Sequence, residues 1–252
     1  MKTIAIVSPV GGAGRTTLTA ELASLLSARG HRMLAVECDP RNVLALHFGL
    51  KEPARAGLTS YLESANPANT ALNTDDNVLL LPWGGGDTAR GAPAGARAQL
   101  LASPGWLREL LARVDMPPDA LALIDTPTWP SVETSQAIAS ADLVLAVLPP
   151  SPTACAVLMR FREALAGTPC VYVINAVIPA RELHVDVVAL LRTSLGDALL
   201  PYQIHADAGL PEALGRGENF CASASGSAAA HDLQGLAAWL SRWASRAGEP
   251  LR

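Results

Sequence analysis

Residues 8–17 read Ser-Pro-Val-Gly-Gly-Ala-Gly-Arg-Thr-Thr, a run with the composition of a phosphate-binding loop. An apolar, β-branched segment (residues 3–7) precedes it, and a helical pattern begins near Thr16. This strand–loop–helix order directs backbone N–H groups and a helix N-terminus toward one point, where phosphate oxygens bind. Glycines suit the loop because its backbone must approach the ligand closely and adopt positive φ. The sequence therefore predicts a nucleotide-binding site.

The cation of this loop is unusual. Such loops commonly end in Gly-Lys-Ser/Thr, with the lysine on the terminal phosphates and the hydroxyl on magnesium. Here Gly14-Arg15-Thr16 keeps a hydroxyl and a positive charge, but a guanidinium is a wide planar fork and not a compact ammonium. The whole chain has two lysines, Lys2 and Lys51, against seventeen arginines. We expect nucleotide binding, whereas fast hydrolysis does not follow.

Polar side chains stand where three predicted strands end. The second strand leads into Asp39, whose carboxylate can hold a water or a magnesium ion near a terminal phosphate. The fourth strand closes on Asp125, and an apolar strand that ends in one aspartate is typical of folds that hold magnesium through its water shell. The sixth closes on Asn175, whose amide offers both a donor and an acceptor to an adenine edge.

Each of these residues also has a plainer interpretation. A lone aspartate such as Asp125 more often caps a turn or a helix, and Asn175 in isolation is a typical turn residue. The nearby phosphate loop favours the magnesium role for Asp125, and the position at a strand end favours the adenine role for Asn175. The five histidines and four cysteines show no metal-ligand spacing, so we interpret them as ordinary surface or core residues.

Strand-like and helix-like segments alternate along nearly the whole chain. The strand candidates are near-continuous apolar runs, as expected for parallel strands covered on both faces: Thr3–Ser8, Met33–Cys38, Val78–Pro82, Leu121–Asp125, Leu143–Leu148, Val171–Asn175 and Leu199–Ile204. The helical patterns are Thr16–Arg29, Ala98–Val114, Ser131–Ser140, Thr153–Ala166, Glu182–Ser194, Asp207–Gly215 and Ala230–Ala247. We expect an α/β fold, a doubly wound and mostly parallel sheet of about seven or eight strands with helices on both faces. Its ligand crevice should lie at the carboxyl ends of the strands.

Composition and charge limit the classes of protein to which this chain can belong. The 252 residues fit one P-loop domain over 1–252, and 50% of them are hydrophobic, which excludes a disordered chain. The net charge of −4 and the lack of a basic block disfavour nucleic-acid binding. Because the chain opens directly on a strand and holds no apolar run of membrane-spanning length, we expect a cytoplasmic protein.

Two segments have open interpretations. The Gly/Ala/Pro-rich stretch Gly84–Ala98 is either a tolerated surface insertion or a loop that contacts a partner. The apolar stripe of Leu233, Leu236 and Leu240 favours a last helix that covers the sheet over one that lies on a membrane surface.

The pattern resembles the MinD/ParA superfamily of deviant-Walker ATPases, nearly over the whole chain. The resemblance rests on the loop 11–17, the turn 39–42, the strand end 124–127 and Asn175. Within the superfamily the chain is similar to the BcsQ (YhjQ) branch of cellulose biosynthesis proteins, through residues 79–84 and the stretch 199–207 that runs into 212–214.

The resemblance implies a role for each matching residue. The loop residues that bind phosphate would be Gly11, Gly12, Ala13, Gly14, Arg15, Thr16 and Thr17. Among these, Arg15 takes the place of the P-loop lysine, Thr16 supplies the magnesium hydroxyl and Thr17 the hydroxyl near the α-phosphate. Asp39 matches the switch aspartate that positions the attacking water, Asp125 the second magnesium-associated residue, and Asn175 the adenine reader.

Two departures from the family pattern bear most on catalysis. Val10 stands where MinD-like dimers have the signature lysine that reaches the partner's nucleotide, and Arg15 replaces the P-loop lysine. In addition, Pro9 removes one N–H from the loop. Loss of a comparable trans-acting cation lowers phosphoryl-transfer rates by on the order of 10³ or more. If the protein hydrolyses ATP at all, we therefore expect it to do so slowly.

The resemblance further implies ATP and Mg²⁺ as cofactors and a homodimer that sandwiches the nucleotide. It implies a cytosolic regulatory or assembly subunit beside a cellulose synthase, which contacts other synthase accessory subunits and meets the inner membrane only through them. The alternative is an actively cycling partitioning or positioning ATPase for DNA or membrane cargo. That class would need the signature lysine, a basic face or a separate amphipathic terminal helix, and the sequence shows none of them. An electron-transferring iron protein would need paired cysteine ligands, and Cys38 and Cys155 lack the spacing.

Overall fold

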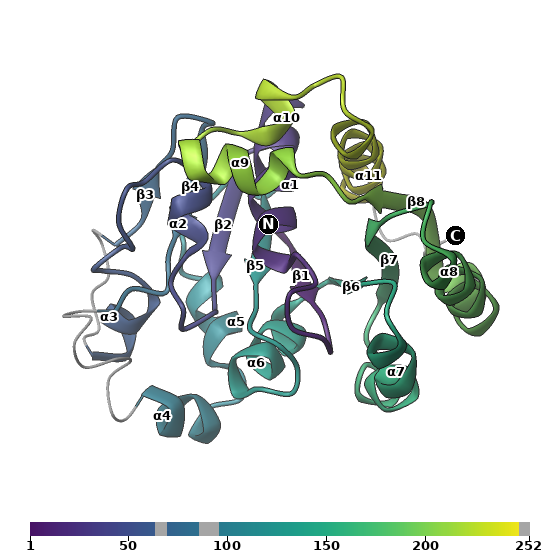
Figure 1. Ribbon diagram of the computed structural model, residues 1–252. Coiled ribbons are helices and arrows are strands. Elements are labelled where there is room, and N and C mark those ends of the chain that lie inside the picture. Colours follow the sequence, from purple (N-terminus) through teal and green to yellow (C-terminus); the bar gives the residue numbers. More distant parts are fainter. Residues whose placement is uncertain (64–69, 86–95, 247–252) are drawn as a thin grey trace.

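A computed structural model of the chain describes residues 1–63, 70–85 and 96–246. These residues contain an eight-stranded sheet in the order β3-β4-β2-β5-β1-β6-β7-β8 (Figure 1). Its strands are β1 (Lys2–Val7), β2 (Met33–Glu37), β3 (Leu72–Asn73), β4 (Val78–Leu81), β5 (Leu121–Asp125), β6 (Leu143–Leu148), β7 (Cys170–Val177) and β8 (Leu199–His205). All neighbouring strands pair in parallel except β3, which runs antiparallel to β4. The predicted fold class is confirmed.

Helices cover both faces of this sheet. They are α1 (Arg15–Ala28), α2 (Leu44–His47), α3 (Leu58–Glu63), α4 (Ala96–Ala102), α5 (Trp106–Leu111), α6 (Val132–Ser140), α7 (Pro152–Ala164), α8 (Glu182–Leu195), the 3₁₀ turn η1 (Gly196–Ala198), α9 (Gly209–Arg216), α10 (Phe220–Ser223) and α11 (Ala228–Ser245). Helices α1, α2 and α9–α11 cover one face and α3–α8 the other, so the molecule has three layers (Figure 1).

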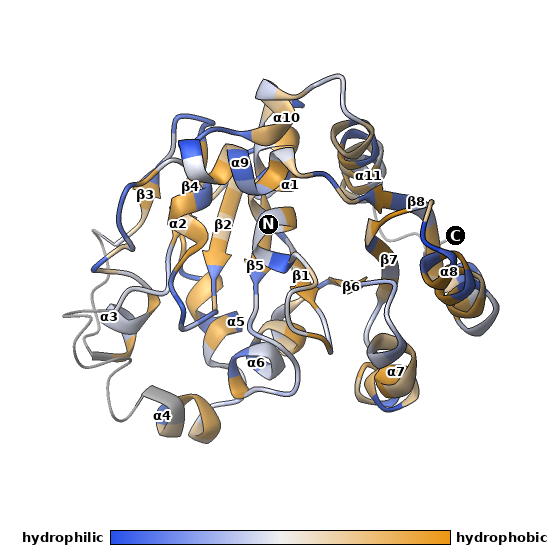
Figure 2. Ribbon diagram, in the orientation of Figure 1, coloured by the Kyte–Doolittle hydropathy of each residue, from blue (hydrophilic) through white to orange (hydrophobic). Residues whose placement is uncertain are grey.

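The alternation of side chains along each strand divides the core between the two faces. On β1, Ile4 and Ile6 pack toward α1 and α11, whereas Ala5 and Val7 pack toward the α5–α8 side. Apolar colours run along β2 and β6, whereas part of the edge strand β8 is hydrophilic (Figure 2). Leu233, Leu236 and Leu240 of α11 are at most 1% exposed, which confirms that the last helix covers the sheet.

The sequence prediction differs from the structure at one long helix and at several short elements. The predicted helix Ala98–Val114 is wrong, because Pro104 and Gly105 separate α4 from α5 and the amide of Trp106 starts a new turn on the Ser103 carbonyl. The strand β3 and the helices α2, α3 and α10 were not predicted; each has two to six residues, too few to show a period.

The predicted Gly84–Ala98 connection is only partly described. Residues 86–95 lie outside the described part of the chain, and α4 begins at Ala96, inside the range expected to be a loop. None of the helices within the described residues is long and apolar enough to cross a membrane.

Candidate nucleotide-binding site

The predicted phosphate loop connects β1 to α1 at the centre of the sheet. Gly14 is the N-cap residue of α1, with φ 89°, and no side chain in the described part of the chain caps the helix there. The first N–H groups of α1 are therefore without a capping side chain, as an anion-binding helix end requires. Gly11 and Gly12 are exposed, whereas Ala13 is buried and Thr17 is half-buried in the first turn.

Asn175 touches the phosphate loop directly. Its amide Nδ2 donates to the carbonyl of Ala13 at 2.8 Å, and the side chain is buried. A Cβ on Gly14 would lie 2.3 Å from that nitrogen, so only glycine fits at position 14. Asn175 does not end its strand as expected: β7 continues to Val177 past Ala176, whose φ of 62° accompanies an irregular pairing with β8. The adenine role of Asn175 stays a prediction.

Arg15 is buried and its guanidinium bonds to the protein itself. Nε donates to the Thr126 carbonyl at 2.8 Å, Nη1 to the Val10 carbonyl at 3.0 Å, and Nη2 to Thr128 Oγ1 at 3.0 Å. Burial lowers the pKa of Arg15, while the carboxylates of Asp125 and Asp39 act in the opposite direction. The fork thus connects the phosphate loop to the segment that follows β5, a geometry that the single ammonium of a lysine cannot reproduce.

Asp125 is fully buried, and neither of its carboxylate oxygens has a hydrogen-bond partner among the described residues. Burial raises its pKa to about 8, Glu37 adds to this rise, and the hydroxyl of Thr16 opposes it. An orphaned carboxylate beside a threonine hydroxyl fits a magnesium ion held partly through its own waters. No cluster of three or more His, Cys, Asp or Glu residues with metal-binding geometry occurs in the described ranges, so a metal here would also need ligands from a nucleotide or water.

Asp39 follows β2 and is buried, with its carboxylate held within its own turn. Oδ1 accepts from the Arg41 amide at 3.0 Å, and Oδ2 accepts from Arg41 Nη2 at 2.7 Å and Nε at 3.0 Å. The side chain of Asp39 is 3% exposed and that of Arg41 is 62% exposed. The pair therefore places one buried negative charge and one solvent-facing positive charge beside the phosphate loop.

The structure adds two residues to which the sequence analysis gave no role. Glu37 is fully buried at the end of β2 and accepts from three backbone amides, those of Val43, Leu44 and Trp83. Burial raises its pKa to about 7. Asn42, buried in the Asp39 turn, bonds to Ala54 and Gly84. A charged residue at the end of an otherwise apolar strand is the signal that could have singled out Glu37.

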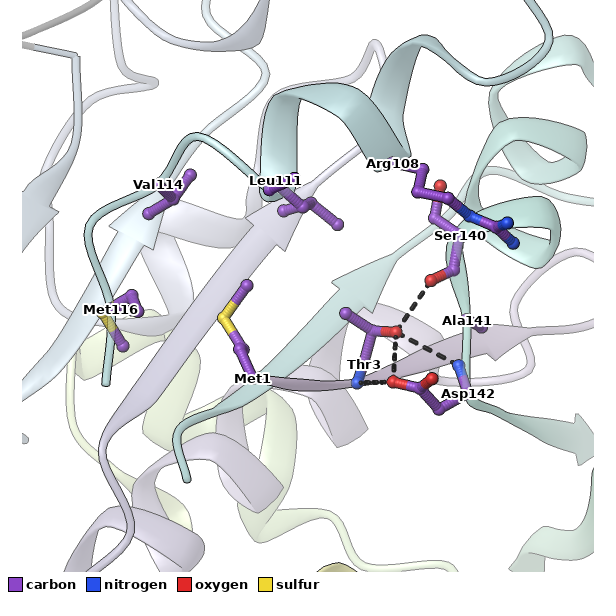
Figure 3. A pocket seen from close by; sticks show the side chains of 10 residues that line it. Met1, Thr3, Arg108, Leu111, Val114, Met116, Ser140, Ala141 and Asp142 are labelled. Carbon is purple, nitrogen blue, oxygen red and sulfur yellow. Dashed lines mark hydrogen bonds between the residues drawn. The ribbon is translucent and has the colours of Figure 1, made fainter. Parts of the chain in front are cut away.

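The predicted residues thus gather at the carboxyl ends of β1, β2, β5 and β7, where the fold was expected to bind its ligand. A separate cavity of about 490 Å³ lies at the other end of the strands, lined by Met1 and Thr3 of the β1 start and by residues of α5 and α6 (Figure 3). Its polar groups bond to one another: Thr3 Oγ1 donates to the Ser140 carbonyl, and Asp142 Oδ2 accepts from the Thr3 amide. None of the predicted site residues lines it.

The family model described as cellulose biosynthesis protein BcsQ matches residues 1–240. The chain belongs to the BcsQ family. The BcsQ protein of Salmonella typhimurium is 26% identical over 238 residues, which cover 91% of this chain and 90% of that protein. The chromosome-partitioning ATPase Soj of Thermus thermophilus is 32% identical over 145 residues, 58% of this chain and 53% of Soj, so the match spans about half of that relative.

Solved structures of MinD/ParA-like ATPases share the fold of this BcsQ-family chain. The septum site-determining protein MinD of Pyrococcus horikoshii, complexed with Mg-ADP, has a TM-score of 0.76 at 24% identity and covers 97% of each chain. MinD of Pyrococcus furiosus has a TM-score of 0.73 at 28% identity, over 96% of this chain and 99% of that one. Cobyrinic acid a,c-diamide synthase of Mycobacterium smegmatis, with a bound ATP analog and magnesium, has a TM-score of 0.77 at 21% identity, over 100% of this chain and 98% of that one.

Proposed function

We propose that this protein binds ATP and Mg²⁺ and acts as a regulatory or assembly subunit of a bacterial cellulose synthesis and secretion system. The observation that carries the nucleotide part is the fully buried Asp125 carboxyl group, whose oxygens lack a well-formed hydrogen bond within the described residues and whose pKa only the Thr16 hydroxyl and the Arg15 charge lower. Burial makes this carboxyl group costly to ionise, as its pKa of about 8 shows, and a bound Mg²⁺ would favour the carboxylate form. The family match supports the cellulose part.

In this proposal each part of the site has one task. The backbone of Gly11–Gly14 and the first turn of α1, with Thr17, bind the phosphates. Thr16 and Asp125 hold Mg²⁺, which supplies charge neutralisation at the phosphate oxygens when bound. Asn175 recognises the adenine, Arg15 supplies the positive charge of the loop, and Asp39 orients water.

We further propose that ATP serves mainly to hold a homodimer together and that its hydrolysis is slow. Val10 offers no charge to a partner's phosphates, and the Arg15 guanidinium is engaged by Val10, Thr126 and Thr128. The site therefore lacks a free ammonium to stabilise charge on a transferred phosphoryl group. Such a dimer would act in the cytoplasm and meet the inner membrane through other accessory subunits of the synthase.

Equilibrium binding of Mg·ATP tests the nucleotide part. Thr16→Ala removes the magnesium hydroxyl and should weaken binding by at least about tenfold in Mg²⁺, and much less in EDTA. Thr16→Ser keeps the hydroxyl and should bind within about threefold of the wild type. If the wild-type protein binds no nucleotide at millimolar concentration, the phosphate loop has lost its function and the proposal is wrong.

A second candidate, an actively cycling positioning ATPase, rests on the matches to Soj and to the maintenance of carboxysome distribution protein A of Synechococcus elongatus. The latter is 32% identical over 84 residues, 33% of that protein. Turnover distinguishes the two candidates: a positioning ATPase must release ADP repeatedly, whereas the proposed assembly subunit retains ATP.

A further inference from the structure

The Asp39 turn is bonded to two segments that lie outside the nucleotide site. A backbone hydrogen bond closes this turn: the Asn42 amide donates to the Asp39 carbonyl at 3.0 Å. Two buried polar side chains, Glu37 before the turn and Asn42 at its end, then bond to the exit of β4 and to the residues that lead into α3.

Glu37 joins the turn to the exit of β4. One carboxylate oxygen, Oε1, accepts from the amides of Val43 at 2.6 Å and Leu44 at 2.8 Å, where α2 begins. The other oxygen, Oε2, accepts from the Trp83 amide at 3.3 Å. Since Glu37 is fully buried, each lost bond would leave a polar group without water to replace the partner.

Asn42 makes a second connection from a backbone with φ 55°. Its Nδ2 donates to the Ala54 carbonyl at 2.6 Å, and its Oδ1 accepts from the Gly84 amide at 3.2 Å. One amide therefore uses its donor on the segment before α3 and its acceptor on the segment after β4. A side chain with only one of these two functions cannot replace it.

The two segments that receive these bonds are themselves in backbone contact. The amides of Leu58 and Thr59 donate to the carbonyls of Pro82 and Trp83 at 2.8 and 2.9 Å. A Cβ on Gly57 would lie 2.1 Å from the Pro82 carbonyl oxygen, so the two backbones are in direct contact and only glycine fits there.

We propose that Glu37 and Asn42 are positioning residues that couple the Asp39 turn to residues 54–59 and 82–85, so that nucleotide bound at the phosphate loop changes the backbone hydrogen bonding and packing of those segments and the start of α3. This inference rests on the proposed function, because it needs a nucleotide beside Asp39. A continuous set of buried hydrogen bonds and touching backbones is a physical route for such coupling. Leu58 and Trp83 of the responding segments belong to the core on the sheet face that α3 covers (Figure 1).

Asn42→Gly is the most direct variant, because glycine keeps the positive φ and removes both side-chain bonds. Asn77→Gly is its matched control: Asn77 also has φ 55°, lies in the exposed turn before β4, and its side chain makes no hydrogen bond within the described residues. Both variants increase the flexibility of the unfolded chain equally. In the nucleotide-free protein, amide hydrogen exchange at 54–59 and 82–85 should accelerate by on the order of tenfold in Asn42→Gly and stay unchanged in Asn77→Gly.

The coupling is tested on the full chain by hydrogen exchange with and without Mg·ATP, with nucleotide affinity measured separately. In the wild type and Asn77→Gly, Mg·ATP should slow exchange at 54–59 and 82–85 by at least about threefold. In Asn42→Gly that response should disappear while ATP affinity stays within about threefold. Glu37→Gln replaces one of the two acceptor oxygens by an NH₂ donor, so the side chain can no longer accept from all three amides in the same arrangement. In this variant Mg·ATP should no longer slow exchange at 82–85.

The outcomes separate the two proposals. A wild-type protein that binds Mg·ATP but shows no response at 54–59 and 82–85 overturns the coupling alone, as does an Asn42→Gly protein that keeps the full response. A wild-type protein that binds no Mg·ATP overturns the proposed function, and the coupling with it.

Discussion

At the scale of single residues, the arginine of the phosphate loop has the largest consequence. Arg15 donates one hydrogen bond from each of its three guanidinium nitrogens, to two carbonyls and one hydroxyl of the protein, and two of these acceptors belong to Thr126 and Thr128 just after β5. A lysine at this position cannot reproduce the three-way fork, and the Thr126 carbonyl is the acceptor that is fully buried there. The substitution therefore gives the loop a structural connection that replaces a free cation.

Replacing Arg15 by lysine should destabilise the protein even though the charge is kept. We expect the free energy of unfolding to fall by about 1–3 kcal/mol in denaturant titrations, because buried acceptors lose their donors. Arg41→Lys is the control, since the Arg41 guanidinium also makes more than one hydrogen bond, to the Asp39 carboxylate, but is mostly exposed, and it should change stability by less than about 1 kcal/mol. Equal losses in the two variants would contradict the structural role of Arg15.

The sequence predicts which residues form the site better than it predicts what each one contacts. Asp39 and Asp125 are found because the carboxyl ends of parallel strands share one edge, which depends only on topology. Two of the three partners of Arg15, Thr126 and Thr128, lie 111 and 113 residues away along the chain, so no local pattern reveals them. The bonds of Glu37 and Asn42 to Trp83 and Gly84 escape prediction for the same reason.

At the scale of elements, continuous apolar runs identified the long strands because both faces of the sheet are covered. The elements that were missed depend on tertiary contacts. Helix α2 has four residues and begins where Glu37 accepts from the amides of Val43 and Leu44, so a side chain of another element fixes its start. The periodicity of hydrophobic residues along the sequence cannot reveal such a short helix.

Helix α2 also carries a pH-sensitive residue. Burial lowers the pKa of His47 to about 4 from its ordinary 6.5. Between these two values the unfolded chain binds the proton and the folded chain does not, so the free energy of unfolding should fall as pH is lowered from 6.5 toward 4. We expect a loss of roughly 1–3 kcal/mol across this window.

His47→Gln removes this titration. Glu37, whose pKa is raised to about 7, acts in the opposite sense between its ordinary 4.5 and 7, so wild type and variant must be compared at each pH. The difference between their unfolding free energies should change by roughly 1–3 kcal/mol from pH 6.5 to 4.5. A pH-independent difference would show that His47 titrates normally in the folded protein.

At the scale of the whole molecule, the three layers leave α11 no free apolar face. Its leucines pack on the sheet, and Lys2 Nζ lies 5.1 Å from the ring centroid of Trp243 near its end. The chain has a net charge of −4. Peripheral helices bind membranes by burying an apolar face and attracting anionic headgroups with basic residues, and here the apolar face is already buried.

The purified protein should therefore not bind vesicles of anionic lipid by itself, with or without Mg·ATP. Co-sedimentation with such vesicles measures this, and uncharged vesicles serve as the control. Membrane recovery in cells should fall when the synthase subunits are removed. Strong sedimentation with pure anionic vesicles would contradict recruitment through partner proteins.

The fate of bound ATP tests the central claim most directly. The protein is loaded with labelled ATP and Mg²⁺, freed of unbound nucleotide, and the bound fraction is identified over time. With no free ammonium at positions 10 and 15, we expect retained nucleotide that remains ATP, converted on the order of 10³-fold more slowly than in an ATPase with the trans-acting cation. Conversion of the bound ATP to ADP within minutes, or recovery of protein without nucleotide, would contradict a protein that keeps ATP as a structural ligand.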